Sequence, residues 1–159
     1  MEDRQSLQLN DSETRREKES YLVVETRGEL YAVRWALVRQ AGMLLQTEID
    51  FARVPPQVQR EGLMFPVCYL WELVGQKPPV EKLMEIPAVF LEEEDKRVVL
   101  VPERILWRQE AVFKELPQWL KKVPVVTGAI VLDSGVPVIL LEPLGSGRTR
   151  EQAACRVLE

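Results

Sequence analysis

The sequence predicts an all-β protein built from two small barrels packed on one another. Apolar runs such as Val98–Val101 and Val138–Leu141 are continuous instead of alternating, as expected for strands that are covered on both faces. Helical periodicity is confined to short segments, and turn signals join the runs into hairpins. Both halves of the 159-residue chain show this pattern, and strands that curl into barrels account for it. The alternative is an α+β domain in which segments 35–45 and 148–158 form helices.

The first 19 residues are expected to form a disordered tail. They contain ten charged side chains and no aromatic residue, so they cannot bury enough apolar area to offset the entropy of ordering them. A helix that forms only on a partner is the alternative. Order is expected from Tyr21, where YLVVETRGELYAV predicts two strands with a glycine turn at residues 27–29. The paired prolines Pro55 and Pro56 then interrupt the chain.

The segment QREGLMFPVCYLWELVG, residues 59–75, predicts a short strand followed by one or two helical turns. The strand covers Leu63–Val67. Gly75 stands where a helix C-cap is expected, and Pro78 and Pro79 prevent the helix from continuing. The same segment contains no metal-ligand spacing and no nucleophile beside a base.

The second half of the chain repeats the strand pattern. IPAVFLEEEDKRVVLV predicts a hairpin whose acidic turn, Glu92–Arg97, is a solvated loop tip. ELPQWLKKV predicts a short helix with its apolar residues on one face. VVTGAIVLDSGVPVILL predicts a final hairpin with its turn at residues 133–135. Residues 146–159 are expected to be a C-terminal extension, with a short helix as one option.

The composition argues against a nucleic-acid or membrane role. The net charge is -4 and the basic residues have acidic neighbours, whereas nucleic-acid binders usually carry a basic surplus. No apolar stretch approaches the roughly 20 residues that span a bilayer, and the polar N-terminus does not resemble a secretory signal. Cys68 and Cys155 lie far apart and are expected to be reduced thiols. These features predict a cytoplasmic protein without direct membrane insertion.

The chain contains no histidine, the side chain on which most acid–base, triad and zinc chemistry depends. Glu92–Asp95 places four carboxylates in a row, but without the spacing of a calcium loop. Asp133 and Ser134 have no histidine base, and Gly-Ser-Gly-Arg at 145–148 lacks the lysine of a phosphate-binding loop. We predict no catalytic residue, no metal site and no cofactor.

Tryptophan is enriched at binding hot spots, and the sequence contains four tryptophans. Core packing explains most tryptophans in proteins, although part of the ring often stays exposed. Trp107, which lies between Leu106 and Arg108 in a charged neighbourhood, is the candidate that reaches a partner-binding surface.

The order and spacing of three segments resemble the CheW-like domain of bacterial chemotaxis. These segments are YLVVETRGELYAVRWALV, GLMFPVCYLWELVG and VTGAIVLDSGVPVILL, and the resemblance covers residues 20–145. The domain occurs as a free coupling protein and as the regulatory domain of the histidine kinase CheA. The resemblance implies two intertwined five-stranded SH3-like barrels with a few short helices. It also implies a hydrophobic groove between the barrels and interaction surfaces at their ends.

In this family, the implied function is a non-catalytic adaptor that couples a chemoreceptor's cytoplasmic tip to a histidine kinase. The resemblance places Val38 in the groove and makes residues 59–75 a wall of the scaffold, with Gly62 permitting a close turn. Glu61 stands where the family commonly has an arginine that is associated with receptor coupling. This reversal of charge predicts a partner that carries Lys or Arg at the contact.

Two further departures change polar positions and leave the apolar pattern intact. Tyr69 replaces an acidic residue of the family, and Pro102 stands in place of an aspartate. Because surface charges select partners, a regulator that binds something other than a chemoreceptor is the second hypothesis. A small carboxylate-based enzyme is the third. The starting methionine and charged tail favour a free-standing protein over a fragment of a kinase.

Overall fold

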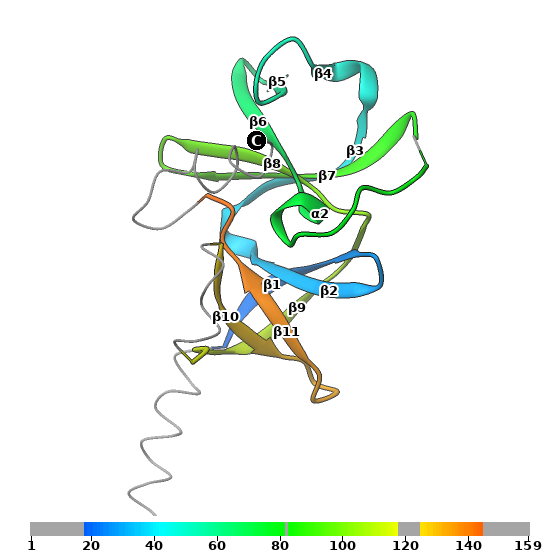
Figure 1. Cartoon of the computed structure of the whole chain (residues 1–159). Helices are drawn as coiled ribbons and strands as arrows, with labels where there is room; N and C mark the ends of the chain where they lie inside the picture. Colours follow the sequence, from blue (N-terminus) through cyan, green and yellow to red (C-terminus); the bar gives the residue numbers. More distant parts are fainter. Residues whose placement is uncertain (1–17, 82, 118–124, 145–159) are drawn as a thin grey trace, which may run out of the picture.

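The computed structural model describes residues 18–81, 83–117 and 125–144. They form two β bodies, one above the other in Figure 1. The first barrel is closed, with the strand order β1-β2-β11-β10-β9. Its strands are β1 (Lys18–Thr26), β2 (Glu29–Arg34), β9 (Arg104–Lys114), β10 (Val126–Val131) and β11 (Pro137–Leu141).

The second body, here called the half-barrel, is a curved sheet with the strand order β3-β7-β8-β6-β5-β4. Its strands are β3 (Val38–Leu45), β4 (Ile49–Asp50), β5 (Gln57–Arg60), β6 (Leu63–Tyr69), β7 (Glu85–Glu93) and β8 (Lys96–Val101). Three short helical elements accompany the strands: the 3₁₀ turns η1 (Trp35–Leu37) and η2 (Gln46–Glu48), and the helix α2 (Leu70–Leu73).

The two bodies are interleaved along the chain. Strands β1 and β2 start the first barrel, β3 to β8 build the half-barrel, and β9 to β11 return to complete the first barrel. A parallel pairing of β11 with β2, which aligns Ile139 with Tyr31, closes the barrel. The half-barrel is therefore one continuous segment inserted into the first barrel, whose strands come from before and after it in the sequence.

Three clusters of buried apolar side chains correspond to the three layers of the molecule. One fills the first barrel around Tyr21 and Ile130, and another fills the half-barrel around Phe65 and Phe90. The third lies between the bodies and combines side chains of both. Because strands that border this third cluster have apolar side chains on both faces, their sequences read as continuous apolar runs.

A polar contact joins the two bodies beside the shared core. Gln76, which follows α2, accepts a hydrogen bond from the Thr26 hydroxyl at 3.2 Å and donates one to the Glu29 carboxylate at 3.1 Å. The Tyr31 hydroxyl donates to the same carboxylate at 2.8 Å. Burial is the main cause that raises the pKa of Tyr31, so this phenol stays protonated and remains a donor at neutral pH.

The predicted all-β class and the principal hairpins are confirmed. β1 and β2 meet at Gly28, β7 and β8 flank the acidic turn, and β10 and β11 flank Asp133-Ser134-Gly135. Gly75 has φ +77 just after α2, as a helix C-cap requires. The tail up to residue 17, residues 118–123 of the predicted ELPQWLKKV helix, and the C-terminal segments at 145–148 and 146–159 lie outside the described residues.

Four expectations need correction. The helix considered for 35–45 is wrong, because this segment forms η1 and the edge strand β3. Order begins before Tyr21, since Lys18 and Glu19 already pair with β9. The half-barrel has six strands where the resemblance implied five, because η2 separates β3 from β4. The eleven-residue strand β9 was not predicted at all.

Candidate partner-binding site

An apolar hollow of about 460 Å³ lies where the outer face of β3 and β7 meets the start of β9. Its lining consists of Ala41, Gly42, Met43, Leu83, Glu85, Pro87, Glu103, Arg104 and Ile105. The Met43 side chain is 59% exposed, and Met84, next to the lining, is 70% exposed. We refer to this feature as the apolar hollow.

The position of β3 explains why these apolar side chains are not covered. Side chains alternate along a strand, so Leu44 is buried in the half-barrel while Met43 points outward. β3 pairs with β7 on one side and is the end strand of its sheet on the other. An edge strand with apolar side chains is a surface that another chain can cover.

A second hollow of about 410 Å³, here called the arginine hollow, lies where β1, η1 and β9 approach each other. Its lining consists of Glu19, Ser20, Arg34, Trp35, Ala36 and Arg108. The Arg108 guanidinium carbon lies 4.6 Å from the centre of the Trp35 ring, within the range of cation–π contact. Arg34 forms ion pairs with Glu142 at 2.8 Å and Glu19 at 3.5 Å.

The two hollows follow the same boundary between the bodies. β9 contributes Ile105 to the apolar hollow and Arg108 to the arginine hollow, while the segment from η1 into β3 contributes Ala36 and Gly42 in turn. On β9, Ile105 lies three positions before Arg108, which is roughly 10 Å of strand, and Ala36 lies six positions before Gly42. Val38 stands between them, half-buried against the shared core. We call these two hollows with Val38 the junction surface.

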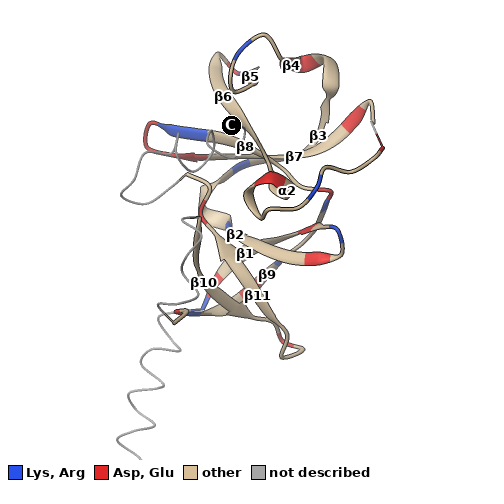
Figure 2. Cartoon of the chain, in the orientation of Figure 1, with Lys and Arg blue, Asp and Glu red and all other residues tan. Residues whose placement is uncertain are grey.

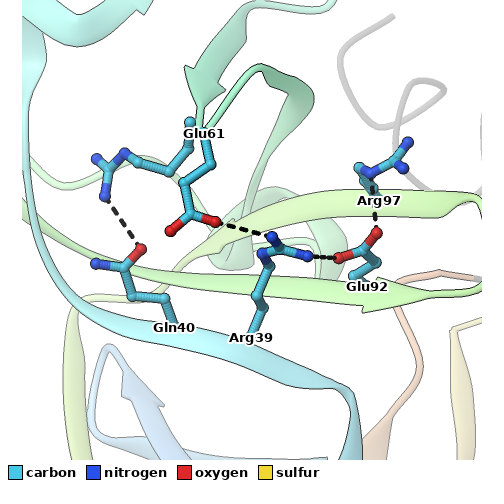
Figure 3. A network of polar contacts seen from close by, with 6 residues as sticks. Arg39, Gln40, Glu61, Glu92 and Arg97 are labelled. Atoms are coloured by element: carbon cyan, nitrogen blue, oxygen red, sulfur yellow. Dashed lines mark hydrogen bonds and ion pairs between the residues drawn. The ribbon is translucent and has the colours of Figure 1, made fainter.

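A network of charges surrounds Arg39, the residue that follows Val38 in the sequence (Figure 3). Arg39 binds the Glu61 carboxylate at 2.8 Å and also pairs with Glu92, whose second oxygen accepts from Arg97 at 3.1 Å. The Arg39 guanidinium holds the pKa of the Glu61 carboxyl below its usual value. The negative charge of Glu61 is therefore present at neutral pH and is already partly balanced within the chain.

The structure brings together three of the four site residues predicted from the sequence. Val38 precedes Arg39, which binds Glu61, and Gly62 follows Glu61 in the β5–β6 turn. Both turn residues have left-handed backbones, with φ +54 at Glu61 and φ +78 at Gly62. Glycine tolerates this conformation at no steric cost, whereas a glutamate does not.

Trp107 lies apart from the other three predicted residues. Its side chain is 44% exposed, which confirms that it reaches the surface, and its indole N–H donates to Gln109 at 2.8 Å. Adjacent strand residues point to opposite faces, so Trp107 and Arg108 face away from each other. Its role in binding a partner stays a prediction.

Sequence reasoning missed Trp35, Met43, Ile105 and Arg108. A signal for the last two was present: RILWRQEAVFK is rich in β-branched and aromatic residues, which favour strands. Recognition of β9 places Arg108 next to the Trp107 that was already a candidate. The exposure of Met43 depends on β3 being an edge strand, which only the sheet order shows.

The acidic residues that were considered as catalytic or metal-binding groups lie in an ion-pair network or in a turn. Glu92 is held by two arginines, and Gly135 completes a turn after Asp133 by donating its N–H to the Leu132 carbonyl at 2.8 Å. Among the described residues, no three His, Cys, Asp or Glu side chains are grouped as metal ligands.

In the same part of the chain, no helix has the length and apolar character needed to cross a membrane. Positive and negative residues are interspersed over both bodies (Figure 2).

Comparison with known proteins identifies the fold. No family model and no curated protein matches this sequence. The crystal structure of the scaffolding protein TtCheW from Thermoanaerobacter tengcongensis is similar, with a TM-score of 0.65 and 15% sequence identity. The similarity covers 80% of this chain and 92% of that chain. The fold is that of a CheW-like domain.

Proposed function

We propose that this protein is a non-catalytic adaptor of chemotaxis-type signalling that couples a chemoreceptor's cytoplasmic tip to a histidine kinase. The observation that carries the proposal is the apolar hollow at the boundary of the two bodies of a CheW-like fold. Exposed Met43, Met84 and Leu83 are large apolar side chains at one site, and such concentrations mark surfaces for partners.

A helix suits the junction surface better than an extended strand does. The apolar hollow is walled by side chains from three segments, which leaves a depression for a helix ridge next to the edge of β3. An amphipathic helix places apolar residues at i, i+3, i+4 and i+7, and such a row matches a linear apolar surface. The half-buried Val38 then supplies an apolar contact in the middle of the junction surface.

The remaining predicted residues have proposed roles at its margins. Glu61 and Gly62 form the turn that borders the surface beside Val38, and the Glu61 carboxylate selects a partner that carries Lys or Arg. Such a partner competes with Arg39 for this carboxylate. Trp107, exposed on β9, offers a separate contact that suits the kinase.

A divergent regulator with a partner other than a chemoreceptor is the second candidate function. The observation that favours it is the acidic Glu61 at the family's arginine position, paired with Arg39 instead of facing a receptor. The fold and the junction surface are the same in both functions. Only the identity of the partner separates them.

Calorimetric titration with a soluble helical hairpin from a chemoreceptor tip tests the proposal. The wild type is expected to bind, and Met43→Asp is expected to weaken binding at least tenfold because it places a charge in the apolar hollow. Val136→Asp is the matched control, since Val136 is 45% exposed but lies in the β10–β11 turn. Absence of binding, or equal effects of both variants, contradicts the proposal.

A further inference from the structure

The arginine hollow contains a guanidinium that no carboxylate of the described chain neutralises. Arg108 is exposed, stacks on the Trp35 ring and donates to the Ser20 hydroxyl oxygen at 3.3 Å. Among the described residues, no carboxylate lies within ion-pair distance of Arg108. Its neighbour Arg34 differs, because Glu142 and Glu19 both bind it.

The stack on Trp35 prepares Arg108 for a carboxylate. Contact with an aromatic ring removes water from one face of the guanidinium and restricts its plane, which lowers the entropy lost on binding. The N–H donors of Arg108 lie at the edge of the guanidinium plane. Among the described residues, the Ser20 hydroxyl accepts a hydrogen bond from one of them. A planar guanidinium with free donors matches a carboxylate, which it binds through two parallel hydrogen bonds.

The other cations near the junction surface already have partners. Arg104, which lines the apolar hollow, donates to Glu25 at 2.6 Å. Arg39, beside Val38, binds both Glu61 and Glu92. Of the arginines that border the surface in the described chain, Arg108 is thus the one whose charge is available to an incoming partner.

We propose that Arg108 is a specificity-determining residue that binds an Asp or Glu side chain of the docked partner, while the apolar hollow receives the partner's apolar anchor. This inference rests on the proposed function and adds the chemistry of its occupant. On β9 the two contacts are roughly 10 Å apart, since Ile105 of the apolar hollow lies three positions before Arg108. On a single helix with a rise of about 1.5 Å per residue, that spacing separates the acidic residue from the apolar anchor by about 7 positions.

A double-mutant cycle with the chemoreceptor-tip hairpin as the probe tests this pairing. One partner of the cycle is Arg108→Gln, and the other is a set of hairpins in which each acidic residue is changed singly to its amide. The control is Arg53→Gln, the same change at an exposed guanidinium that Asp50 holds and that lines neither hollow. The indole ¹⁵N–¹H signal of Trp35 reports contact at the arginine hollow, and that of Trp107, on the other face of β9, serves as the reference.

Arg108→Gln is expected to weaken binding of the unmodified hairpin about tenfold, and one amide hairpin is expected to lose this sensitivity completely. Arg108→Lys is expected to fall in between, because it keeps the charge but loses the planar fork. Arg53→Gln is expected to change affinity less than twofold. If the hairpin binds the wild type and Arg108→Gln alike, the pairing is refuted while the proposed function stands.

Two other outcomes overturn the pairing in different ways. If the hairpin does not bind the wild type, both the pairing and the proposed function fail. If deletion of residues 1–17 and Arg108→Gln each strengthen binding, an acidic segment of the chain itself occupies Arg108, and the assignment to a partner carboxylate is wrong. Concentration-dependent dimerisation that Arg108→Gln abolishes identifies a second copy as the occupant and refutes the pairing as well.

Discussion

Gly128 in β10 fixes how closely β9 packs against the end of the first barrel. A Cβ atom added there lies 2.7 Å from the Lys114 carbonyl oxygen and also meets the Phe113 ring. Both obstacles belong to β9, and one of them is backbone, so a rotamer change cannot remove the clash. Gly128→Ala therefore has to displace β9, which pairs with β10 through Lys114–Ala129 and Phe113–Ile130.

The expected cost of Gly128→Ala is about 1–3 kcal/mol, the usual range for overpacking a well-filled core. For a domain of this size, one kcal/mol corresponds to about 2–4 °C in Tm, so we expect a loss of roughly 2–12 °C. Thermal unfolding followed by circular dichroism measures it. Gly42→Ala is the matched control, because its added Cβ meets nothing within 4 Å and its φ is not positive.

A Tm of Gly128→Ala within 2 °C of the wild type refutes the close packing of β9 on β10. A large loss for Gly42→Ala, whose Tm is expected to stay the same or rise slightly, contradicts the open space over β3. The result bears on function because β9 also carries Ile105 and Arg108 of the junction surface.

Three further predictions concern Val38, Glu61 and Glu72. Val38→Asp is expected to weaken binding of the receptor tip about tenfold or more, since burial of most of a valine is worth roughly 1.5 kcal/mol; isothermal titration measures this. Glu61→Arg places a cation beside Arg39 and is expected to weaken the native partner while improving affinity for ordinary chemoreceptor tips, measured by the same titration. Glu72→Gln is expected to stabilise the fold by about 1 kcal/mol at neutral pH, because one Glu72 oxygen is buried without a hydrogen bond in the described structure; urea unfolding measures this.

The pH dependence of the Glu72 effect has a defined sign. Burial raises the pKa of the Glu72 carboxyl above its ordinary value of 4.5, so the folded state holds this proton more tightly than the unfolded state does. The carboxyl therefore costs nothing in acid, and its cost appears as the pH rises above 4.5. The stability gap between Glu72→Gln and the wild type is expected to widen from pH 4 to pH 7, and a gap that narrows instead contradicts the burial of this group.

Each variant designed to test binding has a control that distinguishes loss of a partner contact from loss of the folded structure. Val38 packs against the shared core, so Val38→Ala, which removes contact area without adding charge, accompanies Val38→Asp. If neither changes affinity beyond about twofold while circular dichroism shows both folded, the contact lies elsewhere. Glu94→Arg, in the exposed β7–β8 turn, makes the same charge change as Glu61→Arg and is expected to leave both affinities unchanged.

The apolar pattern predicted the class of fold because strands around the shared core have both faces buried. Val98–Val101 is the clearest case: all four residues are buried, since one face of β8 lines the half-barrel and the other lines the shared core. The β9 strand escaped prediction because it has the opposite character. Of its eleven residues, Ala111 is buried and the other ten are exposed or partly buried, as on a barrel wall that faces water.

The site was predicted only in part because its geometry depends on long-range contacts. Val38 and Glu61 are 23 positions apart in the sequence. Arg39 follows Val38 and binds Glu61, but no sequence pattern marks this arginine as part of a site. The role of Arg108 depends on its stack on Trp35, and the two meet because β9 and β2 both pair with β1. Local patterns cannot show which charges find partners within the chain, and this decides which charges remain for a partner molecule.

Assembly of a three-component complex tests the adaptor function most directly. A chemoreceptor-tip hairpin is immobilised, and the regulatory domain of a chemotaxis histidine kinase is passed over it with and without this protein. The kinase domain is expected to be retained only when this protein is present, and Met43→Asp is expected to abolish retention while Val136→Asp does not. Retention that is the same with and without this protein contradicts the adaptor function.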